Sequence, residues 1–263
     1  MHHRCRWLVL SSSVIIGIIL SAVMPADAQQ DHSGRLALID SLYCSGDYDG
    51  GLAAVNSGLS EDPDEYELLC WASELLNWKS LSAADESSHQ EAKTLCQEAL
   101  SYARRAVEVN PAGAQGWFQV GQTTGTLSQL PGGSETVDLA RESKAAFERT
   151  LTIDPEHTGA LHGLALWHRA VANLPGYKKL AARILFGGLP PASNDEAVIL
   201  LKKAIRLEPG VIAHHLELGK TYLEMKEREW AREELETVLR LPPLNVRDQK
   251  RKEEAERLLS RIG

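Results

Sequence analysis

Histidines are the side chains best suited to chemistry in this sequence, because they could bind a metal ion or transfer protons. His157, His162 and His168 lie close together along the chain. A metal site needs ligands that converge, and neighbours on one helix face are three or four residues apart. The spacings here are five and six, and His214 and His215 are adjacent, so these side chains diverge. We therefore expect no metal site, with His168 packed between helices and His162 facing a groove.

The sequence offers little for covalent or acid–base catalysis. It lacks a nucleophile elbow, a phosphate-binding loop, a dinucleotide fingerprint and the zinc-protease motif. Its carboxylates mostly alternate with cations, as in residues 226–236, which is typical of a solvated helix face. The formal net charge is -8, which disfavours binding to nucleic-acid phosphates. We predict a protein without enzymatic activity or cofactor and without a nucleic-acid partner; an enzyme of unknown type is the third alternative.

The first 28 residues resemble a secretory signal peptide. Basic residues are followed by an uncharged stretch over residues 7–24 and then by Ala26-Asp27-Ala28, which fits the cleavage pattern. We expect cleavage after Ala28 and export, most simply to a bacterial periplasm. The alternative is an uncleaved membrane anchor, since about 20 apolar residues span a bilayer. In either case, membrane contact is expected only through this segment.

The remaining cysteines, Cys44, Cys70 and Cys96, all fall on expected helices. Export would allow one pair to form a disulfide, and the sequence does not say which. We favour burial of all three as small apolar side chains.

Helix ends recur along the rest of the chain, each marked by a proline that cannot continue a helix. They stand at Asp62-Pro63, Asn110-Pro111, Asp154-Pro155 and Glu208-Pro209, with a fifth at Pro242-Pro243. Small, large and small residues precede these prolines by twelve, eight and five positions, as Ala197, Leu201 and Ala204 do. This spacing places them on one helix face, where the small residues let a second helix approach closely.

A first helix precedes each of these, and residues 212–245 fit the 34-residue tetratricopeptide repeat without insertion. We predict an all-α, tetratricopeptide-repeat-like right-handed superhelix of antiparallel helix pairs with a C-terminal capping helix. The repeat domain covers residues 29–263, with units at about 32–65, 65–113, 114–157, 158–211 and 212–245 and the cap helix at 246–263. Tryptophans at repeat positions, Trp230 among them, are expected in the core.

A more specific resemblance covers roughly residues 154–259. Its distinctive element is Leu185-Phe186 followed by Pro190-Pro191, which generic repeats lack. Together with the sequences around Asp154-Pro155 and Glu208-Pro209, it resembles the regulator of microtubule dynamics protein family. The resemblance implies a tetratricopeptide-type fold, a protein-interaction role and no catalytic motif. We do not carry over the microtubule association of animal members, because an exported chain would not meet microtubules.

In such superhelices the first helix of each pair lines the concave surface, with positions two, five, nine and twelve pointing inward. These positions hold polar and aromatic residues that suit a peptide or an extended segment. The candidate partner-binding residues are Tyr43, Tyr66, Gln115, Phe118, Gln122, His162, Arg169 and Lys220. We predict a scaffold or adaptor of the cell envelope that binds a protein or peptide. The alternative is a periplasmic accessory protein of a transporter that binds a small ligand or hydrophobic cargo.

The insertion at residues 173–193 contains a possible amphipathic helix. Its apolar stripe is opposed by basic residues, a pattern that would suit contact with a membrane or a partner. A short helix usually needs docking to persist, so we favour a spacer helix packed against the repeats. The apolar residues are Tyr177, Leu180, Ile184 and Leu185, and the basic ones are Lys178, Lys179 and Arg183.

Overall fold

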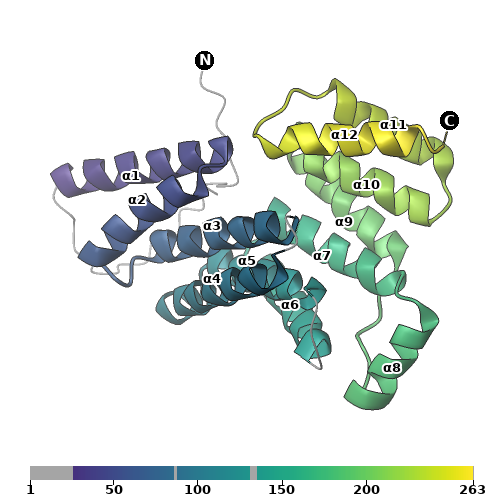
Figure 1. The fold of residues 1–263 in the computed structure, drawn as a ribbon, viewed down its shortest axis with the longest axis horizontal. Coiled ribbons are helices and arrows are strands. Elements are labelled where there is room, and N and C mark those ends of the chain that lie inside the picture. Colours follow the sequence, from purple (N-terminus) through teal and green to yellow (C-terminus); the bar gives the residue numbers. More distant parts are fainter. Residues whose placement is uncertain (1–25, 86–87, 131–134, 263) are drawn as a thin grey trace.

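The computed structural model describes residues 26–85, 88–130 and 135–262, and over these ranges the chain is helical without strands (Figure 1). The helices are α1 (Ala26–Ser45), α2 (Tyr48–Glu61), α3 (Tyr66–Asp85), α4 (His89–Val109), α5 (Ala114–Gln129), α6 (Glu135–Ile153), α7 (Thr158–Ala172), α8 (Gly176–Phe186), α9 (Asn194–Leu207), α10 (Ile212–Glu224), α11 (Arg228–Arg240) and α12 (Arg247–Leu259). The predicted signal peptide lies outside the described residues except for its last three, with which α1 begins. No helix in the described ranges has the length and apolar character to cross a bilayer.

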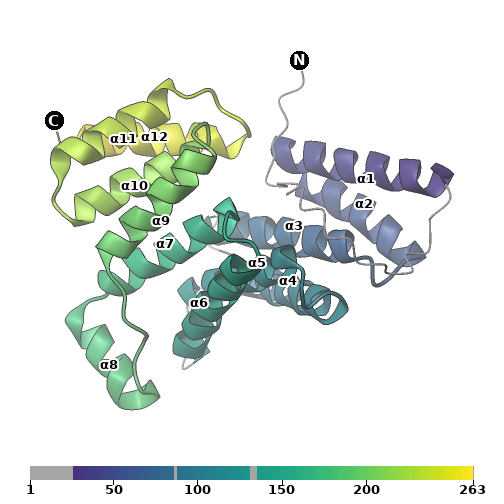
Figure 2. The ribbon, with the colours of Figure 1, turned by 180° about the vertical axis from the view of Figure 1, so that it is seen from behind.

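Helix pairs build the fold. α1 packs on α2, α3 on α4, α5 on α6, α7 on α9 and α10 on α11, while α12 packs on α11 and α10. The first helices α3, α5, α7 and α10 also contact one another in succession, so they form a continuous inner face. The pairs follow an arc that brings α1 close to α12 (Figures 1 and 2). This arrangement confirms the predicted tetratricopeptide-like architecture.

The residue before each proline ends its helix as the sequence predicts. Asp62, Asn110 and Glu208 each leave helical geometry, with φ of -131°, -135° and -134°. The backbone N–H of each still donates to a carbonyl four residues earlier, so the last turn is satisfied. At the other end of α9, the Ser193 hydroxyl accepts from the Glu196 N–H at 3.1 Å and caps the helix.

Close approach of the paired helices depends on the small residues of the repeat pattern. Ala197, Leu201 and Ala204 of α9 are fully buried in the core that α9 shares with α7 and α10. Gly121 of α5 faces the ring of Phe147 of α6, and a Cβ atom placed there would lie 2.7 Å from a ring carbon. Only glycine therefore permits this helix spacing.

Two expectations about packing are wrong. The spacer helix α8 forms, but the side chains of Tyr177, Leu180, Ile184 and Leu185 are 58–71% exposed, and Figures 1 and 2 show the helix projecting from the repeats. Trp230, in the first turn of α11, is 53% exposed, whereas Trp167 of α7 is buried as expected. Cys70 and Cys96 are buried as expected, whereas Cys44 is only half-buried, and the described part of the chain contains no disulfide.

Candidate functional site

The two ends of the arc meet at the inner face. The backbone N–H of Val246, just before α12, donates to the carbonyl of Cys44 near the end of α1 at 3.3 Å. Gly46, with φ +82°, turns the chain here, and a Cβ atom on it would lie 3.0 Å from Val246. The inner face is therefore bounded by the first pair of helices on one side and by α12 on the other (Figure 1).

Arg247 forms the main contact between the ends. Its guanidinium carbon lies 3.8 Å from the ring centroid of Trp78 and 4.4 Å from that of Tyr43. Its Nη1 atom also donates to the Tyr48 hydroxyl at 3.0 Å. A cation over two aromatic faces is attracted by both ring quadrupoles, so Arg247 links α12 to α1, α2 and α3.

Glu74 of α3 organises the aromatic side of this cluster. Its Oε1 atom accepts from the Tyr43 hydroxyl at 3.1 Å and from Trp78 Nε1 at 2.7 Å, and its Oε2 atom accepts from Gln119 Nε2 at 2.8 Å. Burial, and then the Glu74 charge, raise the pKa of Tyr43 well above its ordinary value, so this phenol stays a donor. One carboxylate thus ties α1, α3 and α5 together. We call Tyr43, Glu74, Trp78, Gln119 and Arg247 the aromatic cluster.

A second group, the charged cluster, consists of Arg169, Glu217, Lys220 and Glu254. Arg169 of α7 forms an ion pair with Glu217 of α10, and its Nη1 atom also donates to the Glu217 carbonyl at 3.0 Å. Lys220 lies 3.1 Å from Glu217 and 3.2 Å from Glu254 of α12. Burial favours a raised pKa for Glu217, but Arg169 and then Lys220 outweigh it and hold the pKa at about 2. The inner face therefore carries a fixed, half-buried charge network.

Beside this cluster, His162 of α7 meets His214 of α10. Their Nδ1 atoms are 3.0 Å apart, so one ring donates and the other accepts. Burial lowers the pKa of both, and the neighbouring ring lowers that of His162 further, to about 3. Both rings are consequently neutral at neutral pH. His215 points elsewhere, towards Glu234 and the Pro209 carbonyl.

Four of the eight residues predicted from the sequence belong to these inner-face groups, namely Tyr43, His162, Arg169 and Lys220. The other four lie on α3 and α5. Tyr66 accepts from the Gly116 N–H at 2.7 Å, and the Phe118 ring is buried 4.8 Å from that of His157. Both are packed between helices.

Gln115 and Gln122 share one face of α5. Gln115 Oε1 lies 3.0 Å from His157 Nε2. Gln122 is half-buried and stands one turn beyond Gln119 of the aromatic cluster. Gln122 is therefore an inner-face position, and its side-chain amide forms no hydrogen bond with another residue in the described ranges.

Sequence reasoning missed Glu74, Trp78, Gln119, Glu217 and Arg247. Glu74 and Glu217 were missed because they do not occupy repeat positions two, five, nine or twelve. Arg247 was missed because it belongs to the cap helix, to which the numbering of repeat positions does not apply. One signal was available: Glu74 interrupts the apolar run of residues 68–76, and acids are rarely placed among core residues unless they are paired.

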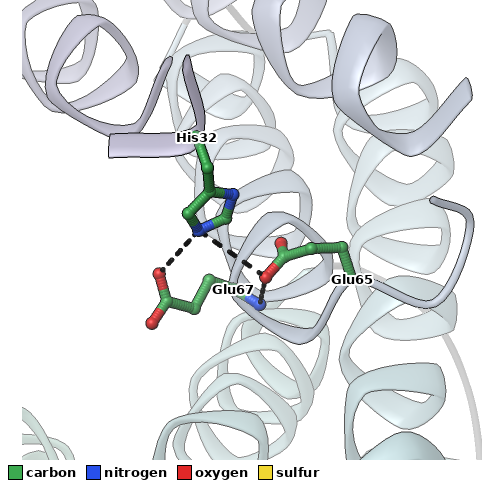
Figure 3. Close-up of side chains that lie close together, drawn as sticks. All are labelled: His32, Glu65 and Glu67. Carbon is green, nitrogen blue, oxygen red and sulfur yellow. Dashed lines mark hydrogen bonds and ion pairs between the residues drawn. The ribbon is translucent and has the colours of Figure 1, made fainter. Parts of the chain in front are cut away.

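Three potential metal ligands, His32, Glu65 and Glu67, gather near the start of α3 (Figure 3). His32 Nε2 lies 3.6 Å from Glu67 and 4.0 Å from Glu65. The Glu65 carboxylate also accepts the backbone N–H groups of Glu67 at 3.2 Å and Leu68 at 2.5 Å. Helix capping accounts for this placement of Glu65, so the cluster is a capped helix start with a nearby histidine.

Paired helices with a continuous inner face define the class of protein: a tetratricopeptide-type helical repeat. In agreement, the crystal structure of a thermophilic TPR protein of Thermus thermophilus superposes with a TM-score of 0.62 at 19% identity, covering 86% of this chain and 98% of that one. The chain belongs to the regulator of microtubule dynamics protein 1-3 family, whose sequence profile matches residues 36–263.

Individual relatives are distant in sequence. Regulator of microtubule dynamics protein 1 of Bos taurus is 29% identical over 176 residues, which is 66% of this chain and 55% of the relative. The Mus musculus protein of the same name is 27% identical over 244 residues, which is 91% of this chain and 77% of the relative. The chain thus spans about half of the bovine protein and three quarters of the murine one.

Proposed function

We propose that the protein is a non-enzymatic scaffold that binds an extended segment of a protein or peptide partner on its inner face. The repeat fold supports protein–protein interaction as the general role. The names of the relatives suggest a regulatory role for this chain. We do not extend the microtubule association to it, because its N-terminal sequence favours export. The proposed location, a bacterial cell envelope, rests on residues 1–28 alone.

Unsatisfied polar atoms in the aromatic cluster carry the proposal. Gln119 is fully buried, and its Oε1 atom has no hydrogen-bond partner in the described structure. The Nε atom of Arg247 is likewise buried without a partner there. A buried polar group without a partner costs about 1–3 kcal/mol. Both atoms are covered in the unbound chain, so a partner would reach them only if the side chains of the aromatic cluster move aside. A peptide main chain offers an N–H donor and a carbonyl acceptor at every residue and could then satisfy both atoms.

The chemistry of the inner face also favours a peptide over apolar cargo. Its lining is built from the aromatic and charged clusters, which combine rings with ionised groups. A separate depression between α4, α5 and α6 is lined by charged residues such as Lys93 and Arg104 as well as by leucines. Apolar cargo would instead require a predominantly apolar pocket.

The test is site-specific photocrosslinking of the full chain in the cells that produce it. A photoreactive residue at Gln122 reports on the inner face, and one at the exposed Gln97 of α4 reports on the outer face. We expect one protein to be captured at Gln122 and not at Gln97. With that protein purified, Gln122→Arg should weaken binding at least tenfold, whereas Gln97→Arg should leave the affinity unchanged. Equal capture at both positions, or equal affinity of both variants, would overturn the proposal.

A further inference from the structure

Helix α8 exposes more large apolar side chains than its size explains. Tyr177, Leu180, Ile184 and Leu185 are all more than half exposed, in a helix of 11 residues. A soluble helix normally buries its apolar stripe, and a helix this short is marginal in water without docking. No described element covers the stripe, so this surface is available to something outside the chain.

The base of α8 is fixed while the helix itself projects. Arg141 of α6 donates from Nε to the Gly188 carbonyl at 3.1 Å, just after the helix, and Lys179 donates to the Ala172 carbonyl at 2.7 Å. Gly187 and Gly188 have φ of +74° and +88°, which makes a sharp turn at the helix end. The helix therefore leaves the repeats at a defined place (Figures 1 and 2).

Charge on α8 is opposite to that of the chain as a whole. The chain has a formal net charge of -8, whereas α8 contains Lys178, Lys179 and Arg183 and no acidic residue. Neither Lys178 nor Arg183 forms an ion pair with a residue in the described ranges. These cations are consequently available for an anionic surface.

Spacing separates Tyr177, Leu180 and Ile184 from the basic residues, whereas Leu185 shares a helix face with Lys178, seven positions earlier. Tyr177, Leu180 and Ile184 follow one another at intervals of three and four, which makes a single stripe along the helix. Lys178 and Arg183 flank it on either side. An apolar stripe bordered by cations is the pattern of a helix that lies in the plane of a membrane interface, with the long basic side chains reaching the headgroups.

We propose that α8 is a membrane-contacting helix that inserts its apolar stripe into the interface of a bilayer containing anionic lipids. The inference is independent of the partner proposed for the inner face. It adds a second membrane contact to the one expected through residues 1–28. It also gives the insertion between α7 and α9 a role in membrane binding. Because one short helix supplies the contact, binding should be reversible and salt-sensitive.

Vesicle flotation with the purified chain, lacking residues 1–28 in every variant, tests this inference. Vesicles of phosphatidylcholine with one quarter phosphatidylglycerol are compared with vesicles of phosphatidylcholine alone. We expect binding to the anionic vesicles, at least tenfold weaker with Ile184→Glu/Leu185→Glu and with Lys178→Glu/Arg183→Glu. Ile199→Glu is the matched control, because Ile199 is 61% exposed on α9.

All three variants alter exposed side chains, so circular dichroism and thermal unfolding should match the parent. The inference is overturned if the parent floats with neither vesicle or if the α8 variants and Ile199→Glu bind equally. It is also overturned if α8 instead captures an acidic protein while the parent ignores anionic vesicles. None of these results bears on crosslinking at Gln122, so the two proposals fail separately.

Discussion

Replacing Arg247 with alanine should open the arc. The substitution removes the guanidinium stacked on Trp78 and Tyr43. It also removes the hydrogen bond to Tyr48, which lies 199 positions earlier in the chain. Arg247 is the only member of the aromatic cluster that belongs to α12, and within the described ranges the backbone hydrogen bond from Val246 to Cys44 also joins the two ends. The two ends should therefore separate while each helix pair stays folded.

The contacts set the size of the effect. A cation–π contact contributes about 0.5–2 kcal/mol depending on desolvation, and a hydrogen bond from a charged donor about 1.5–3 kcal/mol. Part of this is offset because alanine removes the cost of burying the guanidinium and its unpartnered Nε atom. We expect Arg247→Ala to lower the free energy of unfolding by about 2–3 kcal/mol.

Urea unfolding followed by circular dichroism measures the stability, and small-angle X-ray scattering measures the radius of gyration. The control is Arg257→Ala on the same helix. The Arg257 side chain is 61% exposed, and its ion pair with Glu254 is long, at 3.9 Å. Exposed ion pairs of this kind contribute little, so the control should change stability by less than about 0.5 kcal/mol. If the two variants are equally stable and equally compact, the closure described here is wrong.

Two further substitutions test packing and protonation. Gly121→Ala should destabilise the fold by about 1–3 kcal/mol in thermal unfolding because its Cβ atom would press on Phe147, whereas Gly210→Ala, with nothing within 4 Å, should be nearly neutral. Stability should also fall as the pH drops below about 6.5, because the unfolded chain protonates His162 while the folded chain holds its pKa at about 3. The loss from this group is at most about 2 kcal/mol at pH 5, and His162→Gln should reduce the difference between urea midpoints at pH 7 and pH 5. An unchanged difference would show that the histidine is solvated.

Local signals in the sequence predict the architecture well. The prolines after Asp62, Asn110 and Glu208 act through their own covalent geometry, so the helix ends are local consequences of the sequence. The small residues Ala197 and Ala204 likewise indicate a close helix contact without knowledge of the partner helix. Secondary structure and pairing follow from such short-range rules.

The site depends on relations that short-range rules do not reach. His162 and His214 are separated by 52 positions, and spacing within one helix could only exclude a pairing between near neighbours. Arg247 meets Tyr48 because the accumulated rotation of five helix pairs returns the chain to its start, and no local pattern encodes that sum. The environment of α8 is a similar case, because one amphipathic pattern serves a docked helix and an exposed one equally well.

Contact between the first and last helices changes how the molecule can unfold. In an open repeat array each unit contacts only its neighbours, so terminal units can fray independently and stability is roughly a nearest-neighbour sum. The contact between Arg247 and Tyr48 joins the two ends of this linear array. Neither terminal helix pair can then unfold without breaking that contact. Such a junction also raises the contact order, so closing it should be a late and slow step of folding. Contact between the two ends should therefore make the terminal helix pairs unfold together with the rest of the chain, and not independently of it.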